Sequence, residues 1–249
     1  MRTLAPMLVP PLNLPLSNWP TKLLTLLPPW WWMICYHSKR RENRGWPTNY
    51  RGWFWIHASA PQGMEATRAT MQLIDDIVKA VPLGRHRRPP TAETLHASAG
   101  HIVARARLAT CEKNTAAICL RDPWAVEEQY GFVLEELDVL DVPIPWKGAQ
   151  GLVTVDPVDV AIVAHITGRG GAFVLGDNEA TRLLAYHLGR IEHDALLQHL
   201  ARLVSDKQLR LENGAYFVRS YPQKLSAVYK TGEPPTTVTG ATNKQLGLW

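Results

Sequence analysis

The sequence predicts an α+β protein. In residues 101–110 apolar and charged side chains alternate, which is the two-residue period of a half-buried strand. In residues 65–81 apolar side chains instead recur at the three- and four-residue steps of an amphipathic helix: Met71, Ile74, Val78 and Val81. From residue 154 onward helical patterns dominate, so we expect strands to prevail in the front of the chain and helices behind them.

The length and charge of the chain limit the number of domains and the kind of partner that we expect. The chain has 249 residues, 46% hydrophobic and 20% charged, which suits a soluble globular protein of one large or two small domains. Its formal net charge is +5 and its pI is about 9.2. Residues 1–153 hold 17 Lys and Arg against 13 Asp and Glu. This modest excess favours a polyanionic partner.

Three cysteines lack the spacing of a metal site or a disulfide framework: Cys35, Cys111 and Cys119. They predict reduced thiols in a cytoplasmic protein. Neither a metal-ligand set nor a Gly-rich nucleotide loop is visible, so we expect no metal and no cofactor. Residues 1–20 are apolar but interrupted by prolines, which predicts a poorly ordered leader. No apolar run approaches the ~20 residues that would cross a bilayer, so no membrane partner is expected.

The front part predicts these elements in order. A strand over residues 22–27 ends at two prolines, and a short helix over 30–37 follows, with Pro29 near its start, where proline is tolerated. Residues 42–44 are too polar for a buried strand, and we expect them at the rim of a barrel. Strands follow over 53–58, 101–110 and 131–140, with the amphipathic helix over 65–81 and a basic loop over 85–88 between them.

Residues 154–220 predict a small helical domain. Helices are expected over 158–166, over 179–188 with an end at Gly189, and over 194–206. The dipeptide Asn213-Gly214 predicts a tight hairpin turn within residues 208–218. Three helices and a hairpin in this order resemble a winged helix-turn-helix. The tail over 221–249 is rich in Pro, Thr and Gly and is expected to be loose.

The most informative stretch of the sequence is residues 39–51. It places a lysine, several arginines, a glutamate and two asparagines close to six indoles, those of residues 30–32, 46, 53 and 55. Charged side chains resist burial, whereas tryptophan offers flat apolar faces on which nucleic-acid bases can stack. This mixture indicates a binding site more than a core.

The same stretch resembles the signature of the ASCH family, a branch of the PUA-like β-barrels. The residues that carry the resemblance are Pro29, Trp30, Trp31, Trp32, Lys39, Glu42, Asn43, Arg44, Trp46, Thr48, Tyr50, Arg51, Gly52, His57 and Ala58. A closing phrase over residues 143–152 extends it, so it covers about residues 21–153. Trp146 and Val153 depart from the family pattern, and the end of the chain, Lys244 to Trp249, echoes the closing phrase again.

The resemblance implies a PUA-like barrel with flanking helices and a cleft that binds RNA, single-stranded or modified, or a modified nucleoside. The ligand-facing residues that it implies are Trp30, Trp31, Asn43, Arg44, Tyr50, Arg51 and Lys147, together with Lys39 and Glu42. Plainer roles are open as well: Trp30 to Trp32 could pin a helix to the barrel, Arg51 and Lys147 could be solvated charges, and His57 could be structural.

An enzyme of the same architecture is the leading alternative. PUA-like amidohydrolases use a cleft lysine with a threonine three residues later. Lys39 matches that lysine, but Glu42 stands at the threonine position, so the carboxylate would have to activate water as a general base. The substrates considered are the acetyl amide of 4-acetylcytidine and, for a ribonuclease, RNA cut by Lys39 and Glu42 as an acid–base pair.

A third alternative is a regulator that binds DNA through residues 154–220. Gln198, Arg202 and Ser205 lie on the face of the 194–206 helix away from its leucines and could meet a major groove. Asp194 and Asp206 oppose that role, so a protein-docking or dimerisation surface is equally open. The sequence does not predict the oligomeric state.

Overall fold

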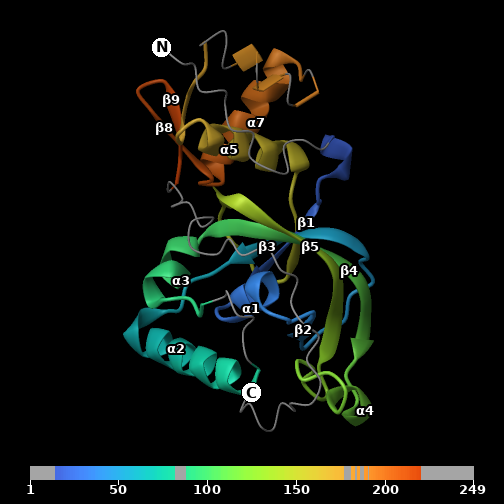
Figure 1. The fold of residues 1–249 in the computed structure, drawn as a ribbon. Coiled ribbons are helices and arrows are strands. Elements are labelled where there is room, and N and C mark those ends of the chain that lie inside the picture. The colour runs from blue at the N-terminus through green and yellow to red at the C-terminus, as the bar shows by residue number, and fades with distance from the viewer. Residues whose placement is uncertain are drawn as a thin grey trace.

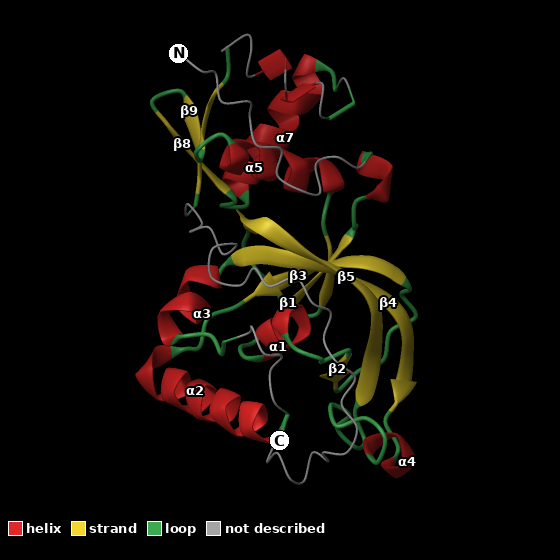
Figure 2. Cartoon of the chain, viewed as in Figure 1, coloured by secondary structure: helices red, strands yellow, loops and turns green. Residues whose placement is uncertain are grey.

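The computed structural model describes residues 15–81, 88–176, 181–182, 184–185, 188–189 and 191–219. Its centre is a curled six-stranded sheet in the order β2-β5-β4-β3-β1-β6, with helices on both sides (Figures 1 and 2). Its strands are β1 (Lys22–Leu26), β2 (Arg41–Arg44), β3 (Gly52–Ala58), β4 (His101–Lys113), β5 (Tyr130–Pro145) and β6 (Leu152–Thr154). Strands β1 and β3 are parallel, and the other neighbours are antiparallel.

One side of this sheet packs on helices α1 (Trp30–Tyr36), α2 (Gly63–Ala80) and α3 (Ala92–Ser98). The 3-10 helix η1 (Leu16–Asn18) lies on the other side, with Leu16 packed beside residues of the C-terminal segment, and the short helix α4 (Ala116–Cys119) has no buried residue. Leu24, Leu26, Phe54 and Ile56 point to this side and join the buried face of α1 in one apolar cluster, which we call the first core. Within α1, Trp31 and Trp32 are fully buried, whereas Trp30 is only partly covered.

The other side of the sheet is covered by the C-terminal segment. Leu23 and Trp55 alternate with the first-core residues of β1 and β3, and they pack with helix α5 (Pro157–Gly168) in a second core. Asp156 caps α5 by accepting a 2.9 Å hydrogen bond from the backbone N of Val158. The second core contains residues on both sides of position 153, where the sequence predicts a domain boundary; that boundary stays a prediction.

A smaller sheet completes the C-terminal segment. Its order is β7-β9-β8, formed by β7 (Ala172–Val174), β8 (Leu209–Glu212) and β9 (Ala215–Val218), with helix α7 (His193–Ser205) preceding β8. Asn213 and Gly214 join β8 to β9 with φ angles of 51° and 77°. Positive φ at both central residues is what a tight type I′ hairpin requires, so the hairpin prediction is confirmed.

The predicted α+β class is confirmed. The expectation for residues 42–44 is wrong in one respect, because β2 is a strand: it pairs with β5 along its whole length, with Arg41 and Glu42 buried. The sequence also failed to predict α3, α4, β6 and β7.

Some predictions fall on residues outside those that the structure describes. These are the leader up to residue 14, residues 85–87 of the basic loop, part of the expected 179–188 helix and the tail from residue 220, with Lys244 and Trp249. No described helix combines the length and apolarity that crossing a membrane would need.

Candidate functional site

Lys39 is a buried cation between two indole rings. It follows α1 and is only 2% exposed. Its Nζ lies 5.2 Å from the ring centroid of Trp30 and 5.6 Å from that of Trp124, and it donates a hydrogen bond to the backbone oxygen of Arg41. Both distances are within the range in which a ring quadrupole attracts a cation.

Glu42 and Arg44 face the same side of β2 because they are two residues apart on a strand. Nζ of Lys39 lies 3.9 Å from Oε2 of Glu42, and Nη2 of Arg44 lies 3.3 Å from Oε1. Glu42 pairs in register with Phe132 of the first core, so the group faces that core. We call Lys39, Glu42 and Arg44, with the rings of Trp30 and Trp124, the Lys39 cluster.

Arg44 is only partly satisfied. Its Nη2 donates a 3.0 Å hydrogen bond to the backbone oxygen of Thr25 in β1. Its Nε is buried and has no hydrogen-bond partner. A buried guanidinium nitrogen without an acceptor is costly, and an acceptor that reached this nitrogen would remove the cost.

Burial shifts both ionisable partners of this cluster toward neutrality. It lowers the pKa of Lys39, although the nearby carboxylates of Glu42 and Asp122 oppose the shift. It raises the pKa of Glu42, against the opposing effect of Lys39 and Arg44. Desolvation disfavours the charged form of each group, so their proton affinities move toward one another. Such perturbed pairs occur often at functional sites.

The residues predicted from the local motif thus meet in space, but two aromatic positions differ in exposure. Trp30 contacts Lys39 and is partly exposed. Trp31 is fully buried in the first core, where a ligand would reach it only if the core opened. Sequence reasoning did not select Trp124, although it lies in the Asp122-Pro-Trp124 turn; its backbone N is fixed by a 2.9 Å hydrogen bond to Oδ1 of Asp122.

Asn43 is engaged in holding the chain together. Its Nδ2 donates to the backbone oxygen of Trp124 at 2.7 Å. Its Oδ1 accepts from Nδ2 of Asn114 at 2.9 Å and from the backbone N of Val126 at 3.2 Å. The geometry therefore supports a structural role: Asn43 fixes the loop that carries Trp124 beside Lys39.

The other three predicted ligand residues make their hydrogen bonds with groups outside the Lys39 cluster. The hydroxyl of Tyr50 donates to the backbone oxygen of Trp53. Arg51 is exposed and donates to the backbone oxygens of Thr48 at 3.0 Å and Tyr50 at 2.7 Å. Lys147 is also exposed, and its backbone N, not its amine, makes the 2.8 Å contact to Oε1 of Gln208.

His57 is a buried, neutral histidine beside the loop that contains Gly148. Its Nε2 lies 3.0 Å from the backbone oxygen of Trp146 and must be the protonated nitrogen, because a carbonyl can only accept. Burial lowers the pKa of His57 to about 4. Its Nδ1 is buried without a hydrogen-bond partner.

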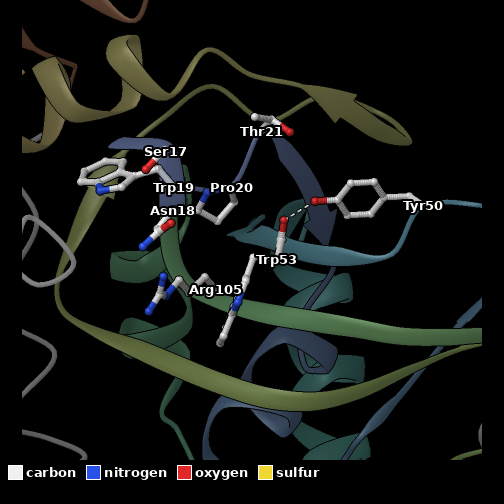
Figure 3. Close-up of a pocket in the computed structure, with 8 residues that line it drawn as sticks. All are labelled: Ser17, Asn18, Trp19, Pro20, Thr21, Tyr50, Trp53 and Arg105. Atoms are coloured by element: carbon white, nitrogen blue, oxygen red, sulfur yellow. Dashed lines mark hydrogen bonds between the residues drawn. The ribbon is translucent and has the colours of Figure 1, made fainter. Parts of the chain in front are cut away.

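A surface pocket of about 490 Å³ opens between η1 and strands β3 and β4 (Figure 3). Its lining residues are Ser17, Asn18, Trp19, Pro20, Thr21, Tyr50, Trp53 and Arg105. The guanidinium carbon of Arg105 lies 4.4 Å from the ring centroid of Trp53. We call this site the Trp53 pocket. Of the residues predicted from sequence, only Tyr50 lines it.

In the C-terminal segment, Arg202 binds aspartates of α5 and its N-cap. Its Nε donates to Asp159 at 2.9 Å and its Nη2 to Asp156 at 2.7 Å, while Nδ1 of His199 lies 2.7 Å from Asp159. The two carboxylates and His199 are close enough to hold a metal ion, but Arg202 already pairs with both carboxylates. Gln198 and Ser205 are exposed on the same helix.

A comparison of the sequence with models of known protein families gives no match, and a comparison with curated proteins gives none either.

Proposed function

We propose that the protein binds a nucleoside, free or within single-stranded or modified RNA, at the Lys39 cluster. The observation that carries the proposal is the buried Nε of Arg44, which lacks an acceptor and lies on the same side chain that contacts Glu42. Folding alone gains little from burying two cations and one carboxylate together. A ligand that supplies the missing acceptor would complete the arrangement.

The chemistry of the cluster suits a nucleobase. Lys39 and Arg44 outnumber Glu42, which leaves one formal positive charge for an electron-rich oxygen or a phosphate. The partly exposed indole of Trp30 supplies a face for stacking, an interaction that contributes on the order of 1–3 kcal/mol per base. Base carbonyl oxygens can accept from Nε of Arg44, and exocyclic amines can donate to Glu42.

Hydrolysis is the second candidate, favoured by the opposite pKa shifts of Lys39 and Glu42. In the form that we propose, the Glu42 carboxylate takes a proton from water, and the hydroxide oxygen bonds to the acetyl carbonyl carbon of 4-acetylcytidine. Lys39 and Arg44 stabilise the resulting oxyanion. The C–N bond then breaks as Glu42 returns the proton to the departing amine, giving acetate and cytidine. The alternative hydrolytic activity is cleavage of RNA with Lys39 and Glu42 as the acid–base pair.

We propose further that the sheet is a PUA-like barrel and that residues 154–220 form a winged helix. The curled sheet supports the first assignment, and the order of α5, β7, α7, β8 and β9, with β7 beside β9, supports the second. DNA binding through α7 has less support, because Arg202 is committed to Asp156 and Asp159. The reduced thiols of Cys35, Cys111 and Cys119 support a cytoplasmic location.

The direct test is to measure binding of 4-acetylcytidine, cytidine and a short single-stranded RNA to the full chain by calorimetry. Arg44→Gln, which removes the cation but keeps a polar side chain, is expected to weaken binding at least tenfold. Arg51→Gln is the matched control, because Arg51 is exposed and contacts only backbone oxygens. Equal losses in the two variants, or no binding by the wild type, would refute the proposed site.

Product analysis separates the binding protein from the enzyme. The wild type is incubated with 4-acetylcytidine, and acetate and cytidine are followed by chromatography beside Glu42→Gln, which keeps the shape of the side chain but removes the base. Binding without product supports the binding function alone. Turnover by the wild type that disappears in Glu42→Gln would establish the hydrolase, and full turnover by Glu42→Gln would exclude the proposed base.

A further inference from the structure

The Trp53 pocket lies on the opposite face of the sheet from the Lys39 cluster. Trp53 and Trp55 are two residues apart on β3, so both point to the side of the second core, to which Trp55 belongs. Glu42 instead pairs with Phe132 of the first core. A ligand in the Trp53 pocket would therefore be independent of one at the Lys39 cluster.

The pocket has the size and lining of a small-molecule site. Its volume of about 490 Å³ falls in the range of roughly 300–1,000 Å³ typical of ligand pockets. Polar groups come from both rims: hydroxyls of Ser17, Thr21 and Tyr50 and the amide of Asn18 (Figure 3). Among the described residues that line the pocket, Arg105 is the only charged one, so none of them carries a carboxylate that would repel an anion.

Arg105 and Trp53 form a stacked pair that a ligand can extend. The guanidinium covers part of the indole at 4.4 Å, and the indole is otherwise partly exposed. Asp138 accepts from Nε of Arg105 at 2.9 Å and from Nη2 at 2.6 Å, which leaves Nη1 for another acceptor. The side chain of Asp138 is 58% exposed and that of Arg105 is 11% exposed, so water reaches this ion pair on the carboxylate side.

We propose that the Trp53 pocket binds a nucleotide, with the base stacked against Trp53 and the phosphate paired with Arg105. A planar ring matches the indole face, and stacking on an aromatic side chain tolerates any base. A phosphate matches the free Nη1 of an arginine better than a neutral group would. The ribose hydroxyls have partners in Ser17, Asn18 and Thr21. Adenosine monophosphate carries all three parts and is a suitable probe.

The test measures binding of three ligands to the full chain by calorimetry: adenosine monophosphate, adenosine without the phosphate, and ribose 5-phosphate without the base. The monophosphate is expected to bind at least tenfold more tightly than either fragment. Trp53→Ala should weaken its binding at least tenfold, and Trp53→Phe should retain most of it. Arg105→Gln should remove the preference for the phosphate while leaving adenosine binding within twofold.

Two controls decide the outcome. Arg107→Gln changes the next arginine on the same face of β4, which pairs with Glu135 and Glu136 outside the pocket, and should leave binding unchanged. Arg88→Gln, at an exposed arginine that does not line the pocket, should also leave it unchanged. No binding of the monophosphate, equal losses in Arg107→Gln and Arg105→Gln, or loss in Arg88→Gln would overturn the proposal. An adenine oligonucleotide that binds more tightly than the monophosphate would show that the pocket binds nucleotides within a nucleic-acid strand. Equal affinity would show that the ligand is the free nucleotide.

Discussion

Gly148 lies directly against the imidazole ring of His57. A Cβ atom built at Gly148 would lie 2.4 Å from Cε1 and 2.6 Å from Nδ1 of His57, and 2.9 Å from Oγ1 of Thr25. The loop that contains Lys147 can therefore close over the ends of β1 and β3 only because residue 148 has no side chain. Ala149 secures the same loop with a 3.2 Å hydrogen bond from its backbone N to Oγ1 of Thr25.

Gly148→Ala should destabilise the protein by about 1–3 kcal/mol, the usual cost of overpacking a filled site. Gly45→Ala is the matched control, because a Cβ atom at Gly45 meets nothing within 4 Å. Urea unfolding of the two variants measures the effect. Equal stabilities would mean that the loop does not rest on His57.

The stability should fall in acid partly because of His57. Its folded pKa of about 4 lies below the ordinary value of 6.5, so the unfolded chain takes up a proton first as the pH falls. The stability that His57 contributes is thus complete above pH 6.5 and is lost as the pH falls toward 4. Its loss between pH 7.5 and 4.5 should be on the order of 2 kcal/mol.

Urea unfolding at these two pH values tests this assignment. His57→Gln should lose less stability between them than the wild type does, because the variant cannot titrate at this position. In His96→Gln, at an exposed position, the free energy of unfolding should differ between the two pH values as much as it does in the wild type. If the difference is as large in His57→Gln as well, His57 is not the group responsible.

Asn43→Ala should lower the free energy of unfolding by roughly 2–4 kcal/mol. The substitution leaves the backbone oxygen of Trp124, Nδ2 of Asn114 and the backbone N of Val126 each without one partner. Each buried polar group left unsatisfied costs about 1–3 kcal/mol. The exposed Asn49→Ala is the control and should change stability by less than about 0.5 kcal/mol. A folded Asn43→Ala of wild-type stability would restore the case for Asn43 as a ligand residue.

Local patterns predicted much of this fold, because apolar periodicity reports which face of an element is buried. The alternation in β4, the period of α2 and the Asn-Gly turn between β8 and β9 all appear in the structure. Strand β2 was not predicted because its residues are polar and the partners that satisfy them are distant in sequence. Arg41 bonds to Glu112, Asn114 and Asp122, all about 70 to 80 residues away. Such compensation cannot be seen in the local sequence.

In the candidate site, too, residues close in sequence could be predicted and residues brought together only by folding could not. Lys39, Glu42 and Arg44 lie within six residues, so a motif was enough to select them together. Trp124 and Thr25 reach the cluster only through tertiary structure. In α7, the helical pattern placed Arg202 on the outer face, but it could not show that Asp156 and Asp159 of the α5 region engage it there.

RNA binding at the Lys39 cluster should weaken as salt rises, and Arg44→Ala should reduce it more than Arg88→Ala. Arg44 is held by Glu42 and Thr25 and would make a positioned contact, whereas Arg88 is exposed and its charge is screened. Fluorescence anisotropy with a labelled single-stranded RNA at 50 and 200 mM salt would measure both variants. A diffuse basic surface would give the two variants equal losses instead.

A bound nucleoside should accept a hydrogen bond from Nε of Arg44, and the Nε–H resonance of this arginine in ¹⁵N-labelled protein reports on that bond. The resonance is assigned by its absence from Arg44→Lys and is followed during a titration with 4-acetylcytidine. A new acceptor should shift the signal and slow its exchange with water, while the Nε–H signals of the exposed Arg51 and Arg88 stay in place. Nucleoside binding that leaves the Arg44 signal unmoved would show that Nε of Arg44 does not contact the ligand.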